Sequence, residues 1–134
     1  MSIELKMLLY AGIVLIVQLV LQVLAGLYQN GIGYSLSPRD DPSNDSGIAG
    51  RVERAFYNML ETFPIFAALA LMVQVTESWT ALTAMGAQLY FWGRVFYGPT
   101  YVAGIPVLRT VIWMISLVGI CLLAWELTRV AIGA

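Results

Sequence analysis

The sequence contains no histidine and a single cysteine, Cys121, among its 134 residues. These two scarcities exclude a disulfide framework, zinc sites built from cysteine and histidine, and every catalytic triad that depends on histidine. We therefore expect no metal site. Charge is scarce as well, because only 11% of the residues are charged and the net charge is −1. A chain with so little positive charge lacks the electrostatic footprint that binding to nucleic acid requires.

Apolar residues are abundant, at 60% of the chain, whereas a soluble domain carries roughly 45–50%. A domain of this length has too little interior to bury the excess, so the excess indicates lipid contact. Four apolar segments reach the length of about 20 residues that a spanning helix needs. They predict membrane helices at about residues 7–28, 49–75, 79–101 and 106–132. The first segment is about twice as long as the apolar core of a signal peptide, which favours a retained helix.

The connections between these segments differ in length and composition. Residues 29–48 are rich in Gly, Pro, Ser and Asp and predict a solvated loop, whereas residues 76–78 and 102–105 predict tight turns. Short connections favour antiparallel neighbours, so the fold class we expect is all-α: an integral membrane four-helix up-down bundle forming one domain, 1–134.

The distribution of basic residues predicts the orientation in the membrane. Lys6 and Arg129 lie on the side of the termini, and more arginines lie on the side of the long loop, namely Arg39, Arg51, Arg54 and Arg109. The positive-inside rule therefore places the long loop in the cytoplasm and both termini on the opposite side.

Polar residues interrupt two of the expected helices, each time on one narrow face. A charged residue inside a span costs about 2.5–3.5 kcal/mol, so each of them needs a reason. The second segment carries a stripe within about 80° of arc, made of Arg51, Arg54, Asn58 and Glu61. The third carries a stripe within about 60° of arc, made of Tyr90, Arg94, Tyr97 and Tyr101. Both stripes also admit a purely structural interpretation as contacts between helices.

The depths of these polar residues in the membrane are similar. Counted from the cytoplasmic ends of their helices, Glu61 and Arg94 differ in depth by only about 5 Å, which predicts an ion pair that offsets the desolvation of both. Gln18 and Gln22 in the first helix approach the same depth. We therefore expect the polar groups to converge on one cavity that opens towards the cytoplasm.

Arg109 is expected in the first turn of the fourth helix, because Pro106 is a favoured first helical residue. A guanidinium and a helix N-terminus together form a strong site for an anion such as a carboxylate or a thiolate. The alternative interpretation is an arginine that anchors the helix at the membrane surface. Cys121 lies in an apolar run of the same helix and is expected to be a buried, unreactive thiol.

Three stretches of the sequence resemble the MAPEG family, the membrane-associated proteins of eicosanoid and glutathione metabolism. RVERAFYNMLETFPIF, from Arg51 to Phe66, is similar to the second-helix signature of the leukotriene-synthase branch. GRVFYGPTY and PVLRT, which begin at Gly93 and Pro106, are similar to the end of the third helix and the start of the fourth. Together with the length and the four segments, the resemblance covers essentially the whole chain.

The resemblance implies a homotrimer of four-helix subunits that binds glutathione in a cytoplasm-facing cavity between neighbouring subunits. Arg109 matches the thiol-activating arginine of the family, and the glutathione contacts match Arg51, Arg54, Asn58, Glu61, Tyr97 and Tyr101. We add Arg94 to the cofactor-binding set, because it shares the face of the two tyrosines.

The leading hypothesis from the sequence is a glutathione-dependent transferase or peroxidase that acts on lipophilic electrophiles. The partners that we expect are membrane lipids and a small lipophilic substrate. The first alternative is a non-catalytic membrane protein whose arginines bind an amphipathic anionic ligand or a lipid. A small transporter built on Glu61 and Arg94 is disfavoured, since the chain shows no inverted repeat.

Overall fold

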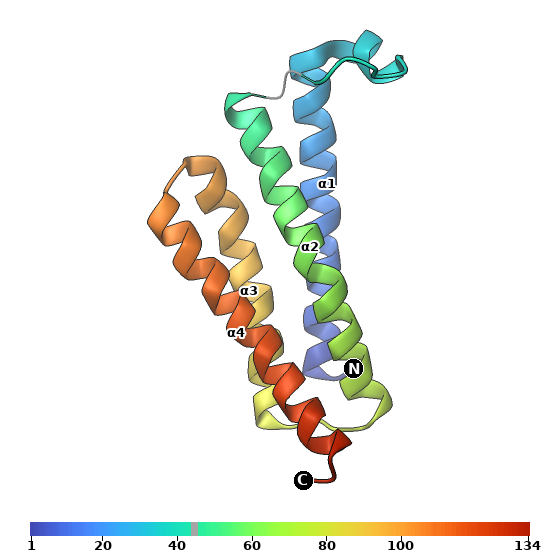
Figure 1. The fold of residues 1–134 in the computed structure, drawn as a ribbon, viewed down its shortest axis with the longest axis vertical. Helices are drawn as coiled ribbons and strands as arrows, with labels where there is room; N and C mark the ends of the chain where they lie inside the picture. The colour runs from blue at the N-terminus through green and yellow to red at the C-terminus, as the bar shows by residue number, and fades with distance from the viewer. Residues whose placement is uncertain (44–45) are drawn as a thin grey trace.

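The computed structural model describes residues 1–43 and 46–134, and every element in this part of the chain is a helix (Figure 1). The helices are α1 (Ile3–Leu36), α2 (Gly47–Val75), α3 (Ala81–Ala103) and α4 (Pro106–Ala131). Successive helices run in opposite directions, as expected. The α1–α2 loop and the α3–α4 turn lie at one end of the bundle, called the loop end below, and both termini lie at the other (Figure 1).

Three of the helices, α1, α2 and α4, are long and apolar enough to cross a membrane. The chain is therefore an integral membrane protein with an all-helical fold. The sequence predicted a fourth span at residues 79–101, and α3 occupies this segment, but it is not among the helices that meet these criteria of length and composition. It contacts all three other helices, and its outer face, which includes Trp92 and Phe96, is exposed. That α3 also crosses the membrane stays a prediction.

The end of α1 departs from the expected boundary. We expected a helix to Tyr28 and a loop over residues 29–48, but helical structure continues to Leu36 with one break at Gly31, where φ is 82° and ψ is 165°. Glycine adopts this conformation without a steric penalty, so the chain bends there and resumes a short helix. The loop prediction is wrong for residues 29–36 and 47–48, which are helical, and holds for the described residues 37–43 and 46; residues 44–45 lie outside the described part.

α1 begins four residues before its expected start, at Ile3, whereas the boundaries of α2, α3 and α4 lie within two residues of the expected ones, because the sequence contains clear start and stop signals there. The side chains and backbones of Thr80 and Thr83 form a reciprocal capping box at the start of α3. Gly104 ends α3 in the left-handed conformation, with φ of 77°, and Pro106 opens α4. This sharp reversal brings the first turn of α4 beside the last turn of α3.

Small residues allow α3 and α4 to pack very closely. A Cβ added at Gly86 would lie 2.7 Å from the carbonyl oxygen of Gly119, and one added at Gly93 would lie 2.8 Å from the Cβ of Ser116. Close approach through glycine and serine is a common way in which membrane helices associate. The α3–α4 pair is therefore a rigid unit that fixes the residues projecting from its loop end.

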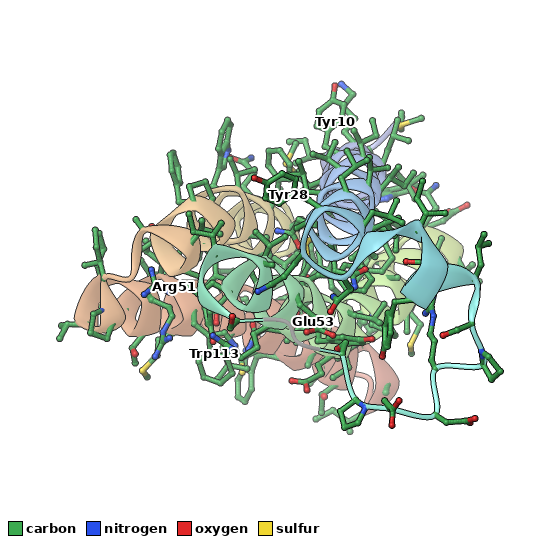
Figure 2. The ribbon with its side chains drawn as sticks, turned by 90° about the horizontal axis from the view of Figure 1, so that it is seen from above. Tyr10, Tyr28, Arg51, Glu53 and Trp113 are labelled. Atoms are coloured by element: carbon green, nitrogen blue, oxygen red, sulfur yellow. The ribbon has the colours of Figure 1, made fainter. Side chains whose placement is uncertain are left out.

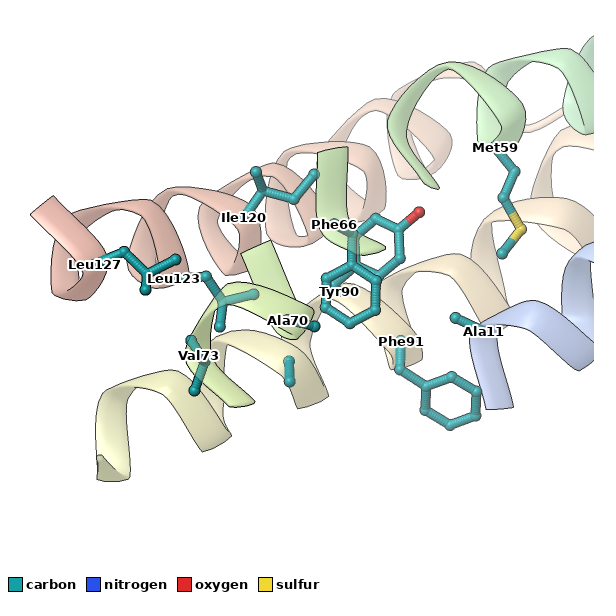
Figure 3. Close-up of a cluster of buried hydrophobic side chains, with 11 residues drawn as sticks. Ala11, Met59, Phe66, Ala70, Val73, Tyr90, Phe91, Ile120, Leu123 and Leu127 are labelled. Carbon is teal, nitrogen blue, oxygen red and sulfur yellow. The ribbon is translucent and has the colours of Figure 1, made fainter. Parts of the chain in front are cut away.

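The apolar core joins buried side chains from all four helices (Figure 3). The rings of Phe66 and Tyr90 stack at its centre, with 4.0 Å between their centroids, and the Tyr90 hydroxyl hydrogen-bonds with the Thr62 hydroxyl at 3.1 Å. The remaining buried members are Ala11, Met59, Ala70, Val73, Ala87, Phe91, Ile120, Leu123 and Leu127. Polar contacts also lie near the termini, where the buried Thr83 hydroxyl of α3 donates a hydrogen bond to Oε1 of Glu4 on α1.

The outer faces of the bundle are apolar and exposed. Tyr10 and Tyr28 project from the outer side of α1 (Figure 2), and Tyr28 is 95% exposed. Cys121 is exposed on α4, so the prediction of a buried thiol is wrong for the subunit. The apolar run around Cys121 faces outwards because lipid, rather than the protein interior, accepts apolar surface in a membrane protein.

Candidate functional site

The polar stripes of α2 and α3 face each other, and Arg94 of α3 lies at the contact. Only 1% of this residue is exposed, and its Nη1 donates a hydrogen bond to Oδ1 of Asn58 on α2 at 2.7 Å. The guanidinium carbon lies 5.7 Å from the ring centroid of Tyr90 and 5.0 Å from that of Tyr97, so aromatic faces flank the charge. The Nε atom of Arg94 is buried and has no hydrogen-bond partner.

The predicted ion pair between Glu61 and Arg94 is wrong. Glu61 is exposed, and the only ion pair within 4 Å in residues 1–43 and 46–134 joins Arg129 to Glu126. Two residues at the same depth in the membrane need not project in the same direction. The Glu61 side chain is rotated by about 60° around the axis of α2 from that of Asn58. Asn58 therefore reaches the guanidinium, and the carboxylate does not.

Tyr101, near the end of α3, is held between two arginines from different helices. Nε of Arg54 on α2 donates a hydrogen bond to the Tyr101 hydroxyl at 3.1 Å. The guanidinium of Arg109, in the first turn of α4 as expected, stacks 4.7 Å from the Tyr101 ring centroid. The rings of Tyr97 and Tyr101 are 5.8 Å apart, which continues the aromatic stripe along α3.

Arg51 caps the end of α3. Its Nη1 donates a hydrogen bond to the backbone carbonyl of Val102 at 3.2 Å, and a Cβ added at Gly104 would lie 3.1 Å from the same atom. A basic side chain at a helix C-terminus satisfies a carbonyl that has no partner within the helix. Arg51 therefore has a structural contact of its own and does not line the site cavity described next.

A cavity of about 310 Å³ opens between α2, α3 and α4 at this place, and we call it the site cavity. Four predicted site residues line it, together with two residues of α4 that sequence reasoning missed; the lining is Asn58, Tyr97, Tyr101, Arg109, Thr110 and Trp113. Trp113 follows Arg109 by one helical turn, so helical spacing from Arg109 is the signal that identifies it. Its Nε1 is buried without a hydrogen-bond partner. Arg51 and Trp113 lie on the α4 side of α2, whereas Glu53 lies on the side of the α1–α2 loop (Figure 2).

The glutamines of α1 do not join this cavity, so the expectation of a single convergent site is wrong for them. Gln18 lines a different cavity between α1, α2 and α3, and Gln22 lines a third beside the α1–α2 loop. In the described part of the chain α1 contacts α2 and α3 but not α4. The packed pair of α2 and α3 therefore separates the side chains of α1 from Arg109.

Arg109 is the charged residue that lines the site cavity, whereas Arg54 and Arg94 do not line it but hydrogen-bond with the lining residues Tyr101 and Asn58. Within the described residues, no carboxylate oxygen lies within 4 Å of the guanidinium groups of Arg54, Arg94 or Arg109. Unpaired guanidinium groups bind carboxylates and other oxyanions strongly, and with both nitrogens when the geometry allows. Glu61 is the carboxylate of the α2 stripe and is exposed. The arrangement suits a small anionic ligand that also carries a cationic group.

Comparison with known proteins agrees with the resemblance seen in the sequence. Residues 7–128 match the model of the MAPEG family, which covers nearly the whole chain. No curated protein matches the chain.

Proposed function

Since the chain belongs to the MAPEG family, we propose that it is a membrane-embedded glutathione-dependent transferase or peroxidase that acts on lipophilic electrophiles. The observation that carries the proposal is the site cavity, which Arg109 lines and whose lining residues Tyr101 and Asn58 contact Arg54 and Arg94. None of these three arginines has a carboxylate partner among the described residues. Guanidinium groups that have no carboxylate partner bind oxyanions strongly, and an anionic ligand would supply the missing partner.

The chemistry of glutathione matches the groups present. The tripeptide has two carboxylates, an ammonium group and a thiol. Arg54 and Arg94 are suited to the carboxylates, and the exposed carboxylate of Glu61 to the ammonium group. The indole Nε1 of Trp113, which has no partner, would donate to a peptide carbonyl. The full set that we assign to glutathione is Arg51, Arg54, Asn58, Glu61, Arg94, Tyr97 and Tyr101.

Arg109 would act on the thiol. A free thiol has a pKa of about 8.5 and is mostly protonated at neutral pH. A guanidinium in the first turn of a helix favours the thiolate, which is the reactive nucleophile. In the transferase reaction the thiol proton passes to water, a bond forms between sulfur and the electrophilic carbon, and the leaving group departs with its electron pair. An apolar electrophile would arrive from the lipid.

The site cavity is open on one side in the subunit, and we propose that a neighbouring copy closes it in a homotrimer. The broad apolar face of α4 remains exposed and is available for such contacts. We also propose that the loop end faces the cytoplasm, because the arginines gather there. A mass measurement of the protein–detergent complex, corrected for bound detergent, tests the trimer.

The catalytic proposal is tested by conjugation of glutathione to a hydrophobic electrophile in detergent. We expect Arg109→Ala to lower kcat/KM by about 100-fold, the size of effect seen when a group that stabilises a reacting anion is removed. Lys6→Ala is the matched control, since it removes a cation at the opposite end of the bundle. Wild-type turnover no faster than that of Arg109→Ala would remove the catalytic proposal.

The second candidate is a non-catalytic protein that binds an amphipathic anionic ligand or a lipid headgroup. The same unpaired guanidinium groups favour it, because they recognise negative charge rather than sulfur. The two candidates predict opposite results in a stability titration. If glutathione leaves the stability unchanged while an anionic lipid raises it, the non-catalytic function is the correct one.

A further inference from the structure

A second cavity, of about 410 Å³, lies between α1, α2 and α3, and we call it the α1 cavity. It is bounded by residues of α2 and α3 that point away from the site cavity, including Val52 and Ala55, and none of its lining residues also lines the site cavity. Its volume falls within the range of natural pockets for small molecules, about 300–1,000 Å³. The α1 cavity is thus large enough to hold a ligand of its own.

The wall of the α1 cavity is apolar except for one side chain, Gln18. The Oε1 atom of Gln18 is buried and has no hydrogen-bond partner among the residues that the structure describes. The amide lies against α3 where Gly98 leaves room for it, because a Cβ added at Gly98 would be 3.0 Å from Nε2 of Gln18. A buried amide oxygen without a partner loses its solvation without compensation, so a hydrogen-bond donor from a ligand would stabilise it.

The backbone of α3 adds a second acceptor to the same wall. Pro99 lies inside α3 and has no N–H group, so the carbonyl of Val95, four residues earlier, lacks its usual helical donor. Val95, Gly98 and Pro99 all line the α1 cavity. Backbone groups released by proline inside a membrane must be satisfied locally, which again favours a ligand that donates a hydrogen bond.

The position of the α1 cavity indicates where its ligand comes from. Ile13, Val17 and Leu21 of α1 line it and are each about half exposed, so the cavity reaches the outer surface of a membrane-spanning helix. No charged residue lines it, and an ionised ligand would therefore be buried without a counter-charge. The occupant that fits is neutral, mostly apolar and present in the bilayer.

We propose that the α1 cavity is a binding site for a neutral single-chain lipid alcohol, distinct from the site cavity. The alkyl chain packs against the apolar wall, and the hydroxyl group donates its hydrogen bond to Oε1 of Gln18. A lone water molecule is a poorer occupant, because it needs two to four polar partners and leaves most of the apolar volume empty.

The site is tested by photolabelling the full chain in phosphatidylcholine nanodiscs with a dodecanol that carries a diazirine on its chain. Mass spectrometry should find the label on residues 13–21, 52–55 and 95–102. Ala55→Leu fills the cavity and should lower labelling there at least five-fold, whereas Ala68→Leu, on the exposed surface of α2, should leave it unchanged. Label spread evenly over the outer surface of α1, or equal labelling in the two variants, would overturn the proposal.

The role of Gln18 is tested by competition, which remains informative if Ala55→Leu does not fold. Unlabelled dodecanol should displace the probe at least ten-fold more effectively than dodecyl methyl ether, which has no donor. This preference should vanish in Gln18→Leu and persist in the matched control Gln22→Leu. Equal competition by alcohol and ether in the wild type, as expected if water or a second copy of the chain fills the cavity, would refute the assignment. Glutathione is absent throughout, so the result does not depend on the proposed catalysis.

Discussion

Replacing Asn58 by leucine removes the only side-chain hydrogen bond that Arg94 makes within the described residues, the 2.7 Å contact between Nη1 and Oδ1. Leucine has a similar size, so the change leaves little empty space and mainly removes the acceptor. Hydrogen bonds between neutral side chains in membrane proteins contribute only about 0.6 kcal/mol on average. A hydrogen bond to a charged group contributes about 1.5–3 kcal/mol. Because Arg94 is 1% exposed and its Nε already lacks a partner, we expect the loss to be about 2 kcal/mol.

The assay is denaturant unfolding in a fixed detergent concentration without glutathione, so that no added anion replaces the lost acceptor. The double variant Asn58→Leu/Arg94→Met separates the charge from the packing. Removing both partners of a buried polar contact is often neutral or stabilising, so the double variant should return to within about 1 kcal/mol of the wild type. An Asn58→Leu variant as stable as the wild type, or a double variant less stable than Asn58→Leu, would refute the reasoning.

Two further predictions concern helix packing and capping. Gly119→Ala should destabilise the protein by about 1–3 kcal/mol, because the added Cβ would meet the backbone oxygen of Gly86. The control is Gly26→Ala, where nothing lies within 4 Å of the added Cβ. This variant should be neutral or stabilising in the same unfolding assay. Arg51→Ala should cost about 0.5–1 kcal/mol, since the exposed Arg51 donates only one hydrogen bond within residues 1–43 and 46–134, to the carbonyl of Val102. A larger loss would mean that Arg51 has a role in the folded subunit beyond capping α3.

The sequence was most informative where one physical signal dominates. Long apolar runs located α2, α3 and α4 to within two residues, and Gly104 and Pro106 marked the turn between the last two. Helical spacing also placed Tyr97 and Tyr101 on one face of α3, and the structure brings this face to Asn58 of α2 in the site cavity.

The partners of individual side chains were harder to predict, because periodicity defines the face of a helix but not which helix covers it. Gln18 shares the depth of the site cavity, yet α2 and α3 stand between it and Arg109. Arg94 pairs with Asn58 instead of Glu61 owing to a rotation of about 60° along α2. Trp113 was not among the predicted site residues, since nothing in the composition of α4 shows that its indole N–H faces a polar cavity.

The most direct test of the central claim is whether glutathione stabilises the folded protein through its carboxylates. At 100 times its Kd, a ligand that binds only the folded state raises the free energy of unfolding by about 2.7 kcal/mol. We predict this increase for glutathione with the wild type, little or none for glutathione diethyl ester, and a clear reduction in Arg54→Ala and Arg109→Ala. Equal stabilisation by glutathione and its diester, or none by either, would contradict an anion site formed by the arginines around the site cavity.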